Sequence, residues 1–344
     1  MRGFCAGLRI LLVTQMWPTE AEPDLGAFLL PSVAAFREAG HVVEVCALSR
    51  RGGSRAKYAR LCRDAIGSAR RFKPDVVFAH FLFPAGFAGL LAARAARAPL
   101  VVMAHGQDVA NLDRVALRLA TAPVVRGCAA VIANSAWLAA RLTSHFPKVE
   151  PVVIDLGVDL SQFAPGATPA ASWPGGGEHP RFLCVGSLID RKNVLALAGA
   201  FERLGRGSLV FVGDGPLRAQ LESRPGVSVI GRVPHTEIPS WIAAADILCQ
   251  PSLVEPFGLA ALEAMALERT VIATSIGGPP EFVTPPAGIL IDPHDPTALS
   301  RALADATAYP TPNPAAREAA SLHDATKQAT RMAEVLRQAI TIPR

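Results

Sequence analysis

The chain has 344 residues, half of them hydrophobic, and a formal net charge of +5. This length predicts about two domains, and the hydrophobic content excludes an extensively disordered protein. The positive charge suits an anionic ligand or membrane surface, although it also suits plain solubility. The sequence contains no run of basic residues interspersed with aromatic residues, so we do not predict nucleic-acid binding.

The six cysteines are scattered along the chain and form no CxxC pair. Cys46, Cys184 and Cys249 fall inside apolar runs. This pattern predicts reduced thiols that pack as small hydrophobic side chains, with no disulfide or zinc framework.

The N-terminal sequence is expected to form a first strand and not a signal peptide, because Arg9 interrupts its apolar run and no small-residue cleavage site follows. Residues 76–93 are apolar over a length that would span a membrane. Pro84, Gly86 and Gly89 interrupt this run, so a buried strand followed by a helix explains it better. We therefore expect a cytoplasmic protein, with peripheral contact at the inner face of a membrane left open.

Strand-like and helix-like segments alternate through the first half of the chain. Short runs rich in Val, Ile and Leu predict strands at 9–13, 42–48, 76–81, 100–104, 130–133 and 152–155. The segments between them predict helices at 28–39, 55–72, 85–96, 114–126 and 136–146. Continuous apolar strands separated by helices are typical of a parallel sheet covered on both faces.

Residues 163–180 are dense in Pro, Gly and Ala and show no periodicity, which predicts a linker or a long loop. Beyond it, strands are predicted at 182–185, 208–212, 227–230, 247–250, 271–274 and 288–291. The predicted helices are 194–204, 217–224, 237–245, 259–267 and 296–309, with a tail helix over 315–339. The sequence thus predicts an α/β protein with two doubly wound, Rossmann-like domains that face each other across a cleft.

We expect the first domain over residues 1–165, a linker over 166–180 and the second domain over 181–312. The tail, residues 313–344, is expected to pack back toward the first domain.

Ligands of open α/β sheets bind beyond the carboxyl ends of the strands. In the second domain the first predicted strand is followed by Gly186, Arg191 and Lys192. The glycine permits close approach of the backbone, and the two cations stand at the start of a helix, as suits a diphosphate. A basic helix cap without a ligand is the alternative. Gly213-Asp214-Gly215 is a weak dinucleotide signal, because Arg218 stands where the third glycine would be.

The most informative stretch is 251–267, where a predicted strand leads through a turn into a helix that starts at Leu259. This geometry directs backbone N–H groups and the positive end of the helix dipole away from the sheet edge. Glu255 in the turn and Glu263 in the helix add carboxylates, which accept hydrogen bonds from a diol. We therefore predict a site for a ligand that is both anionic and hydroxyl-rich, such as a nucleotide sugar. A surface helix with incidental acids is the alternative.

In the first domain His105 follows the fourth predicted strand, and Gly106 gives access to it. Gly26 follows the first strand and begins a segment whose amides would reach a phosphate. A lone histidine is more often structural, and His80 at the end of the neighbouring strand has the more buried pattern. No GxSxG, HExxH or P-loop motif occurs, and no acidic pair stands at a strand end as a metal site would require.

Together these residues resemble the retaining glycosyltransferases of family 4, which have the two-domain GT-B fold. The resemblance extends over nearly the whole chain. The segment from Glu255 to Leu259 with Glu263 is similar to the Glu-x7-Glu signature of that family. Further segments match in spacing and order: Leu156 to Asp159 with Phe163, Gly213 to Leu217, and Gly277-Gly278 with Glu281.

The resemblance implies that Lys192 neutralises the donor diphosphate, that Glu263 holds the ribose hydroxyls and that Glu255 holds the donor sugar. His105 resembles the active-site histidine near donor sugar and acceptor. The expected catalytic residues are His105 and Glu255, and the expected donor-binding residues are Gly26, Gly186, Arg191, Lys192, Phe257, Gly258, Leu259 and Glu263. One departure is Ser187, where the family often has arginine. Either Arg191 supplies the second cation or the diphosphate binds more weakly.

The resemblance implies sugar transfer from a nucleoside-diphosphate sugar to a hydroxyl of a glycan, lipid-linked or small-molecule acceptor, with retention by same-face substitution. The first domain would serve the acceptor and the second the donor. Lys192, Arg191 and the helix end would stabilise the leaving diphosphate, so no cofactor and no metal is expected. The alternatives are an epimerase or phosphorylase on the same fold, or a non-catalytic module that binds sugar nucleotides.

Overall fold

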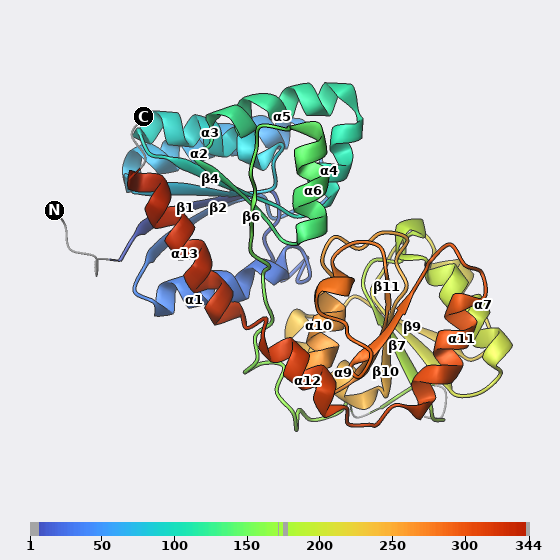
Figure 1. Ribbon diagram of the computed structural model, residues 1–344. Helices are drawn as coiled ribbons and strands as arrows, with labels where there is room; N and C mark the ends of the chain where they lie inside the picture. The colour runs from blue at the N-terminus through green and yellow to red at the C-terminus, as the bar shows by residue number, and fades with distance from the viewer. Residues whose placement is uncertain (1–6, 171, 175–177, 342–344) are drawn as a thin grey trace. The chain divides into compact units, whose positions relative to one another are not determined.

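The computed structural model describes residues 7–170, 172–174 and 178–341. The chain forms two compact units: unit 1 comprises Met1–Leu156 and Ala325–Arg344, and unit 2 comprises Gly157–Asp324 (Figure 1). The expectations for Cys5, for residues 171 and 175–177 of the predicted linker and for the last three residues of the tail lie outside the described residues.

Unit 1 is built on a six-stranded parallel sheet with the order β2-β1-β3-β4-β5-β6. Its strands are β1 (Arg9–Thr14), β2 (Val42–Ala47), β3 (Val76–His80), β4 (Leu100–Ala104), β5 (Ala130–Ala133) and β6 (Val152–Val153). β3 and β4 are buried along their whole length, as their continuous apolar runs predict. The strand order reverses between β1 and β3, and ligands of open α/β sheets bind at such a reversal.

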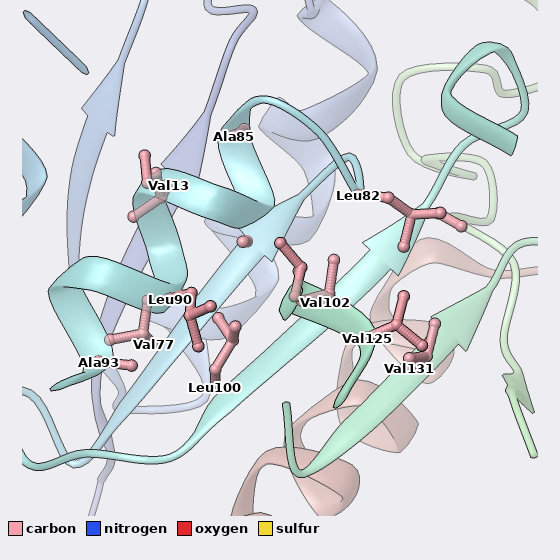
Figure 2. Close-up of a cluster of buried hydrophobic side chains, with 14 of the residues drawn as sticks. Val13, Val77, Leu82, Ala85, Leu90, Ala93, Leu100, Val102, Val125 and Val131 are labelled. Carbon is pink, nitrogen blue, oxygen red and sulfur yellow. The ribbon is translucent and has the colours of Figure 1, made fainter. Parts of the chain in front are cut away.

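The helices of unit 1 divide between the two faces of this sheet. They are α1 (Leu30–Glu38), α2 (Ala56–Phe72), α3 (Ala85–Ala96), α4 (Gln107–Ala110), α5 (Val115–Gly127), α6 (Ala136–His145) and α13 (Ala325–Thr341), with the 3₁₀ helices η1 (Ala27–Leu29) and η2 (Asn111–Asp113). Side chains of α2, α3, α5 and α6 pack on one face, where Leu90 of α3 and Val125 of α5 lie beside Val77 and Val102 of the sheet (Figure 2). Residues 76–93 thus form a strand followed by a helix, as predicted. None of the described helices is both long and apolar enough to cross a membrane.

The opposite face of the unit 1 sheet is covered by α1 and α13, which lie side by side (Figure 1). Met332 and Leu336 of α13 are fully buried in a core that also contains Phe36 of α1. The single tail helix predicted over 315–339 is therefore wrong, because α12 (Pro314–Ser321) belongs to unit 2 and ends before α13 begins. The two helices separate because their apolar faces fill different cores.

Unit 2 contains a second six-stranded parallel sheet, with the order β12-β11-β10-β7-β8-β9. Its strands are β7 (Arg181–Val185), β8 (Ser208–Val212), β9 (Val227–Gly231), β10 (Ile247–Gln250), β11 (Thr270–Thr274) and β12 (Gly288–Ile291). Its helices are α7 (Val194–Leu204), α8 (Arg218–Glu222), α9 (Ile238–Ala244), α10 (Leu259–Ala266), α11 (Ala298–Asp305) and α12, with the 3₁₀ helices η4 (Asp190–Lys192), η5 (His235–Glu237), η6 (Pro279–Glu281) and η7 (Ala306–Ala308). Here the strand order reverses between β7 and β10.

The segment predicted as a linker over 166–180 does not connect the two units. The chain passes between them at residues 156–157 and 324–325. The described part of the segment packs on unit 2, where Trp173 donates a hydrogen bond to Ser208 over 2.7 Å and the Ala170 amide donates to the Ser240 carbonyl over 2.9 Å. Its Pro, Gly and Ala content fits a long surface loop as well as a linker, and Trp173 anchors that loop.

Candidate functional site

The reversal of strand order in unit 2 brings Lys192 and Glu255 together. Lys192 ends η4 after β7, and Glu255 lies in the loop after β10. Lys192 Nζ is 2.5 Å from Glu255 Oε2, and the Ser252 hydroxyl donates a hydrogen bond to the same oxygen over 2.9 Å. Both side chains of this ion pair are largely buried, so the sheet topology builds a charged pair at the position where ligands of such folds bind.

The loop that carries Glu255 is fixed by its neighbours on both sides. Arg191 donates a hydrogen bond through Nη1 to the Val254 carbonyl over 3.0 Å. The Glu255 amide donates to the Ile276 carbonyl, and the Gly278 amide donates to the Glu255 carbonyl. The glycine motif at 277–278 therefore has a structural explanation: a Cβ on Gly277 would lie 1.8 Å from the Glu255 carbonyl oxygen, closer than any side chain permits.

Glu255 is held as a carboxylate by its cationic neighbours. Burial acts to raise its pKa, but Lys192, followed by Arg191 and the Ser252 hydroxyl, outweighs burial and holds the pKa below the usual range. A charged pair that the fold holds in place before a ligand arrives is typical of electrostatic preorganisation.

Gly186 lies beneath the lysine side chain. Its φ of 142° is one that residues with side chains rarely adopt, and Lys192 Cε is the nearest heavy atom to the position that a Cβ would take, at 3.9 Å. Gly213 at the end of β8 crosses Gly186 so closely that its own Cβ would lie 1.9 Å from the Gly186 carbonyl oxygen. Ser187 is exposed at the surface. Glycine at 213 is therefore required by close backbone packing, and glycine at 186 is favoured by its backbone conformation.

Helix α10 begins after Gly258, which has a φ of 107°. Among the described residues no side chain caps this end, so the N–H groups of the first turn, from Leu259 onward, have no cap acceptor. Phe257 is buried and packs on Phe282 with ring centroids 5.3 Å apart. The aromatic pair thus anchors the turn before the helix.

Glu263 stands in the middle of α10 with 5% of its surface exposed. Its Oε1 lies 2.9 Å from Nε2 of His235 in η5. Burial acts to lower the pKa of His235, but the hydrogen bond and charge of Glu263, with a contribution from Asp159, raise it above its ordinary value. His235 was not predicted as a site residue, although it follows the predicted strand at 227–230 closely.

His105 and His80 form a pair in unit 1. His80 Nδ1 is 2.9 Å from His105 Nε2, and the rings are stacked. Burial lowers the pKa of His105 to about 3, and burial together with the His105 ring lowers the pKa of His80 well below its ordinary value. Both rings are therefore neutral at physiological pH, which lets His105 exchange hydrogen bonds with a ligand without carrying charge.

Two further features hold His105 in place. The rings of Phe28 and Phe81 pack on it, with centroids 5.3 and 4.5 Å away. Phe81 has a φ of 79°, a strained conformation for an aromatic residue and one that tends to occur at functional sites. The Asp108 carboxylate accepts hydrogen bonds from the amides of Leu82, His105 and Gly106, which joins the ends of β3 and β4.

The predicted site residues therefore fall into two groups. Gly26, in the left-handed conformation before η1, and His105 belong to unit 1, and the ring of Phe28 in η1 connects them. The other predicted residues belong to unit 2 and lie in the segments that follow β7 and β10, as far as Glu263 in α10. Among the described residues, no three His, Cys, Asp or Glu side chains are grouped as a metal ion would require.

Two family models match the chain. Residues 7–162 match the model described as Glycosyltransferase Family 4, and residues 179–308 match the model described as Glycosyl transferases group 1. The chain belongs to glycosyltransferase family 4. The first model runs from unit 1 into the first residues of unit 2, and the second lies within unit 2.

Curated relatives agree with this assignment. The D-inositol 3-phosphate glycosyltransferase of Streptomyces scabiei is 30% identical over 269 residues, which cover 67% of this chain and 59% of the relative. The GDP-mannose-dependent alpha-(1-6)-phosphatidylinositol monomannoside mannosyltransferase of Mycolicibacterium smegmatis is 30% identical over 250 residues, which cover 66% and 65%. The chain thus spans about three fifths of the length of the curated relatives it matches.

Solved structures establish the GT-B fold. Sucrose-phosphate synthase from Thermosynechococcus elongatus matches with a TM-score of 0.80 at 20% identity, over 96% of this chain and 98% of that one. Anabaena HepE in complex with UDP matches with a TM-score of 0.72 at 22% identity, over 96% and 100%. The two six-stranded parallel sheets are those of this fold.

The two site histidines are expected to titrate differently. His105 should stay neutral between about pH 5 and pH 9, whereas His235 should change charge above the ordinary histidine value of about 6.5. NMR titration of the chain with isotope-labelled histidine measures both, and the variants His105→Gln and His235→Gln assign the signals. A His105 signal that titrates near neutral pH would contradict the buried neutral pair.

Proposed function

We propose that this protein is a retaining glycosyltransferase that moves a sugar from a nucleoside-diphosphate sugar to an acceptor hydroxyl. The observation that carries this proposal is the buried ion pair between Lys192 and Glu255 beside the uncapped start of α10. A cation and free N–H groups suit a diphosphate, and the Glu263 carboxylate on the same helix suits the ribose diol.

In the proposed reaction the bond between the sugar C1 and the diphosphate oxygen breaks, and its electron pair stays with that oxygen. Lys192 and Arg191 stabilise the negative charge that grows there. The acceptor hydroxyl attacks C1 from the face that the diphosphate leaves, and its proton passes to the departing phosphate oxygen. Because protein cations supply the charge stabilisation, we propose that neither metal nor other cofactor takes part.

The donor and the acceptor are proposed by chemical class. HepE has been crystallised with UDP and with UDP-glucose, and the Mycolicibacterium smegmatis relative is named for GDP-mannose and a phosphatidylinositol acceptor. These names support a nucleoside-diphosphate sugar as donor and a glycan, lipid-linked or small-molecule hydroxyl as acceptor. An epimerase or a non-catalytic binding module would share the nucleotide site but would not transfer the sugar to an acceptor hydroxyl. A phosphorylase would use a sugar phosphate in place of the nucleotide sugar, so it would release no nucleoside diphosphate.

The proposal is tested first by binding and then by transfer. Thermal-shift measurements with UDP-, GDP- and ADP-sugars in EDTA should show stabilisation by one of them, and release of the nucleoside diphosphate should require an acceptor. Loss of activity in EDTA that Mg²⁺ or Mn²⁺ restores would overturn metal independence. Release of the diphosphate without sugar transfer would contradict the transferase.

The two glutamates should fail in different ways. Glu263→Gln should weaken binding of the bare nucleoside diphosphate about tenfold to a hundredfold, since a lost charged hydrogen bond costs about 1.5–3 kcal/mol. Glu255→Gln should keep this affinity, because Lys192 retains its charge for the diphosphate, and should lower kcat far more than it raises KM. Calorimetry with the diphosphate and steady-state kinetics measure the two effects. Equal loss of diphosphate affinity in both variants would show that Glu255 does not face the sugar.

We further propose that unit 1 contacts an anionic membrane surface through the basic side chains on and beside α2. They are Arg55, Lys57, Arg60, Arg63, Arg70, Arg71 and Lys73, and all but Lys57 are exposed. Asp64 pairs with Arg60 and Arg63, which reduces the positive charge of this helix. A basic helix that is merely solvated is the alternative.

In a flotation experiment the protein should rise with anionic vesicles at low salt and stay behind at high salt, because salt screens the attraction between exposed charges. Neutral phosphatidylcholine vesicles serve as the control. The double variant Arg63→Glu and Arg70→Glu should abolish binding. Failure of the unmodified protein to bind anionic vesicles at low salt would end this part of the proposal.

A further inference from the structure

We propose that His235 is a positioning residue for nucleotide binding: it holds one oxygen of Glu263 so that the other oxygen faces the ribose diol. This inference rests on the function proposed above, because it takes Glu263 as the acceptor for the ribose hydroxyls. His235 itself is not placed against the ligand, and it acts through the glutamate.

The carboxylate of Glu263 has one oxygen engaged and one available. Oε1 lies 2.9 Å from His235 Nε2, and no other described residue forms a hydrogen bond or ion pair with this side chain. The Glu263 side chain is only 6% exposed, and that of His235 is 19% exposed. An ionised carboxylate is costly to bury without a partner, so His235 makes a charged Glu263 tolerable at this depth. It also fixes the direction of the free oxygen.

The position of His235 is set by the segment of residues 157–163. The Phe163 ring packs edge-on against the histidine ring, with centroids 5.5 Å apart. The Gln162 side chain donates a hydrogen bond to the His235 carbonyl over 3.3 Å. Asp159 adds a second negative charge that favours the protonated ring. The histidine is therefore held by its ring, its backbone and its charge.

The same segment is tied to the far end of the helix that carries Glu263. Arg317 of α12 donates hydrogen bonds to the Phe163 carbonyl over 2.8 Å and to the Ala266 carbonyl at the end of α10 over 2.7 Å. The segment that positions His235 and the helix that carries Glu263 thus share an anchor. This gives a structural purpose to the segment from Leu156 to Phe163, which the family resemblance singled out without a role.

A simpler explanation is that the pair only fastens η5 to α10. The two explanations differ in what they predict for ligands. If the pair only fastens η5 to α10, loss of His235 would weaken the binding of all nucleotides alike and lower the stability of unit 2. If His235 positions Glu263, its loss would weaken the binding of only those ligands that have the ribose diol, because a ligand without the diol makes no use of the free carboxylate oxygen.

The test combines variants of the protein with variants of the ligand. UDP, GDP and their 2′,3′-dideoxy counterparts are titrated by calorimetry into the unmodified chain, His235→Leu and His235→Gln. His235→Gln is the conservative variant, since its amide N–H takes the place of Nε2–H. His294→Gln, at an exposed histidine of the same unit, is the matched control.

We expect His235→Leu to lose about tenfold in affinity for the diol ligand that binds and less than about twofold for its dideoxy counterpart, as for one charged hydrogen bond. His235→Gln should recover most of the loss, and His294→Gln should resemble the unmodified chain. Equal loss for both ligands in His235→Leu, or an unchanged preference for the diol, would overturn the inference. If His235→Leu does not fold, His235→Gln is compared with the unmodified chain at pH 6 and pH 8. A preference for the diol ligand that is as large as in the unmodified chain supports rescue by the glutamine. A lost preference in this folded variant overturns the inference.

Failure of the proposed function gives a different result. If neither UDP nor GDP binds to the unmodified chain, the nucleotide site itself is wrong and the inference falls with it. If the nucleotide binds and only the selective effect of His235 is missing, the nucleotide site stands and the positioning role is rejected.

Discussion

The buried ion pair between Lys192 and Glu255 is the constraint around which the candidate site of unit 2 is built. Taking both charges out of water costs several kcal/mol each, and their attraction offsets this cost only in well-fixed geometry. The structure supplies that geometry through the Ser252 hydroxyl, the bond from Arg191 to the Val254 carbonyl and the glycine at 277, which lets the next loop pass beside Glu255. An ion pair of this kind is weak evidence for stability. It is better explained as a charged site assembled before the ligand arrives.

The two units solve the problem of a polar site in opposite ways. In unit 2 the charged side chains of Lys192 and Glu255 pair with each other. In unit 1 burial lowers the pKa values of His80 and His105, so both rings are neutral. Both sites lie at the carboxyl ends of parallel strands, and both require unusual backbone, at Gly186 and Gly258 in one unit and at Phe81 in the other. Unit 2 therefore presents charged groups at its candidate site, whereas unit 1 presents neutral rings.

Much of this was predictable from sequence because the buried strands are continuous runs of Val, Ile and Leu, and because the site residues follow those strands directly. The sequence could not reveal which strands are neighbours, so the contact of Lys192 with Glu255 required the order in which β7 lies next to β10. The pairing of His235 with Glu263 depends on how η5 packs on α10, which no local pattern encodes. The tail was wrongly predicted as one helix because α12 and α13 have similar periodicity, and only the separate cores show why the chain breaks between them.

Helix α10 shows how these parts act together. Its first turn is left without a side-chain cap, its middle carries Glu263, and the carbonyl of its last residue, Ala266, accepts a hydrogen bond from Arg317. A cation at the C-terminal end complements the negative pole of the helix dipole. The positive pole is then the end that lacks a protein partner among the described side chains, and that end adjoins the Lys192–Glu255 pair. Stabilising the helix from its far end leaves the N–H groups of its near end available to a ligand. The arginine of α12 and the proposed nucleotide thus serve opposite poles of one helix.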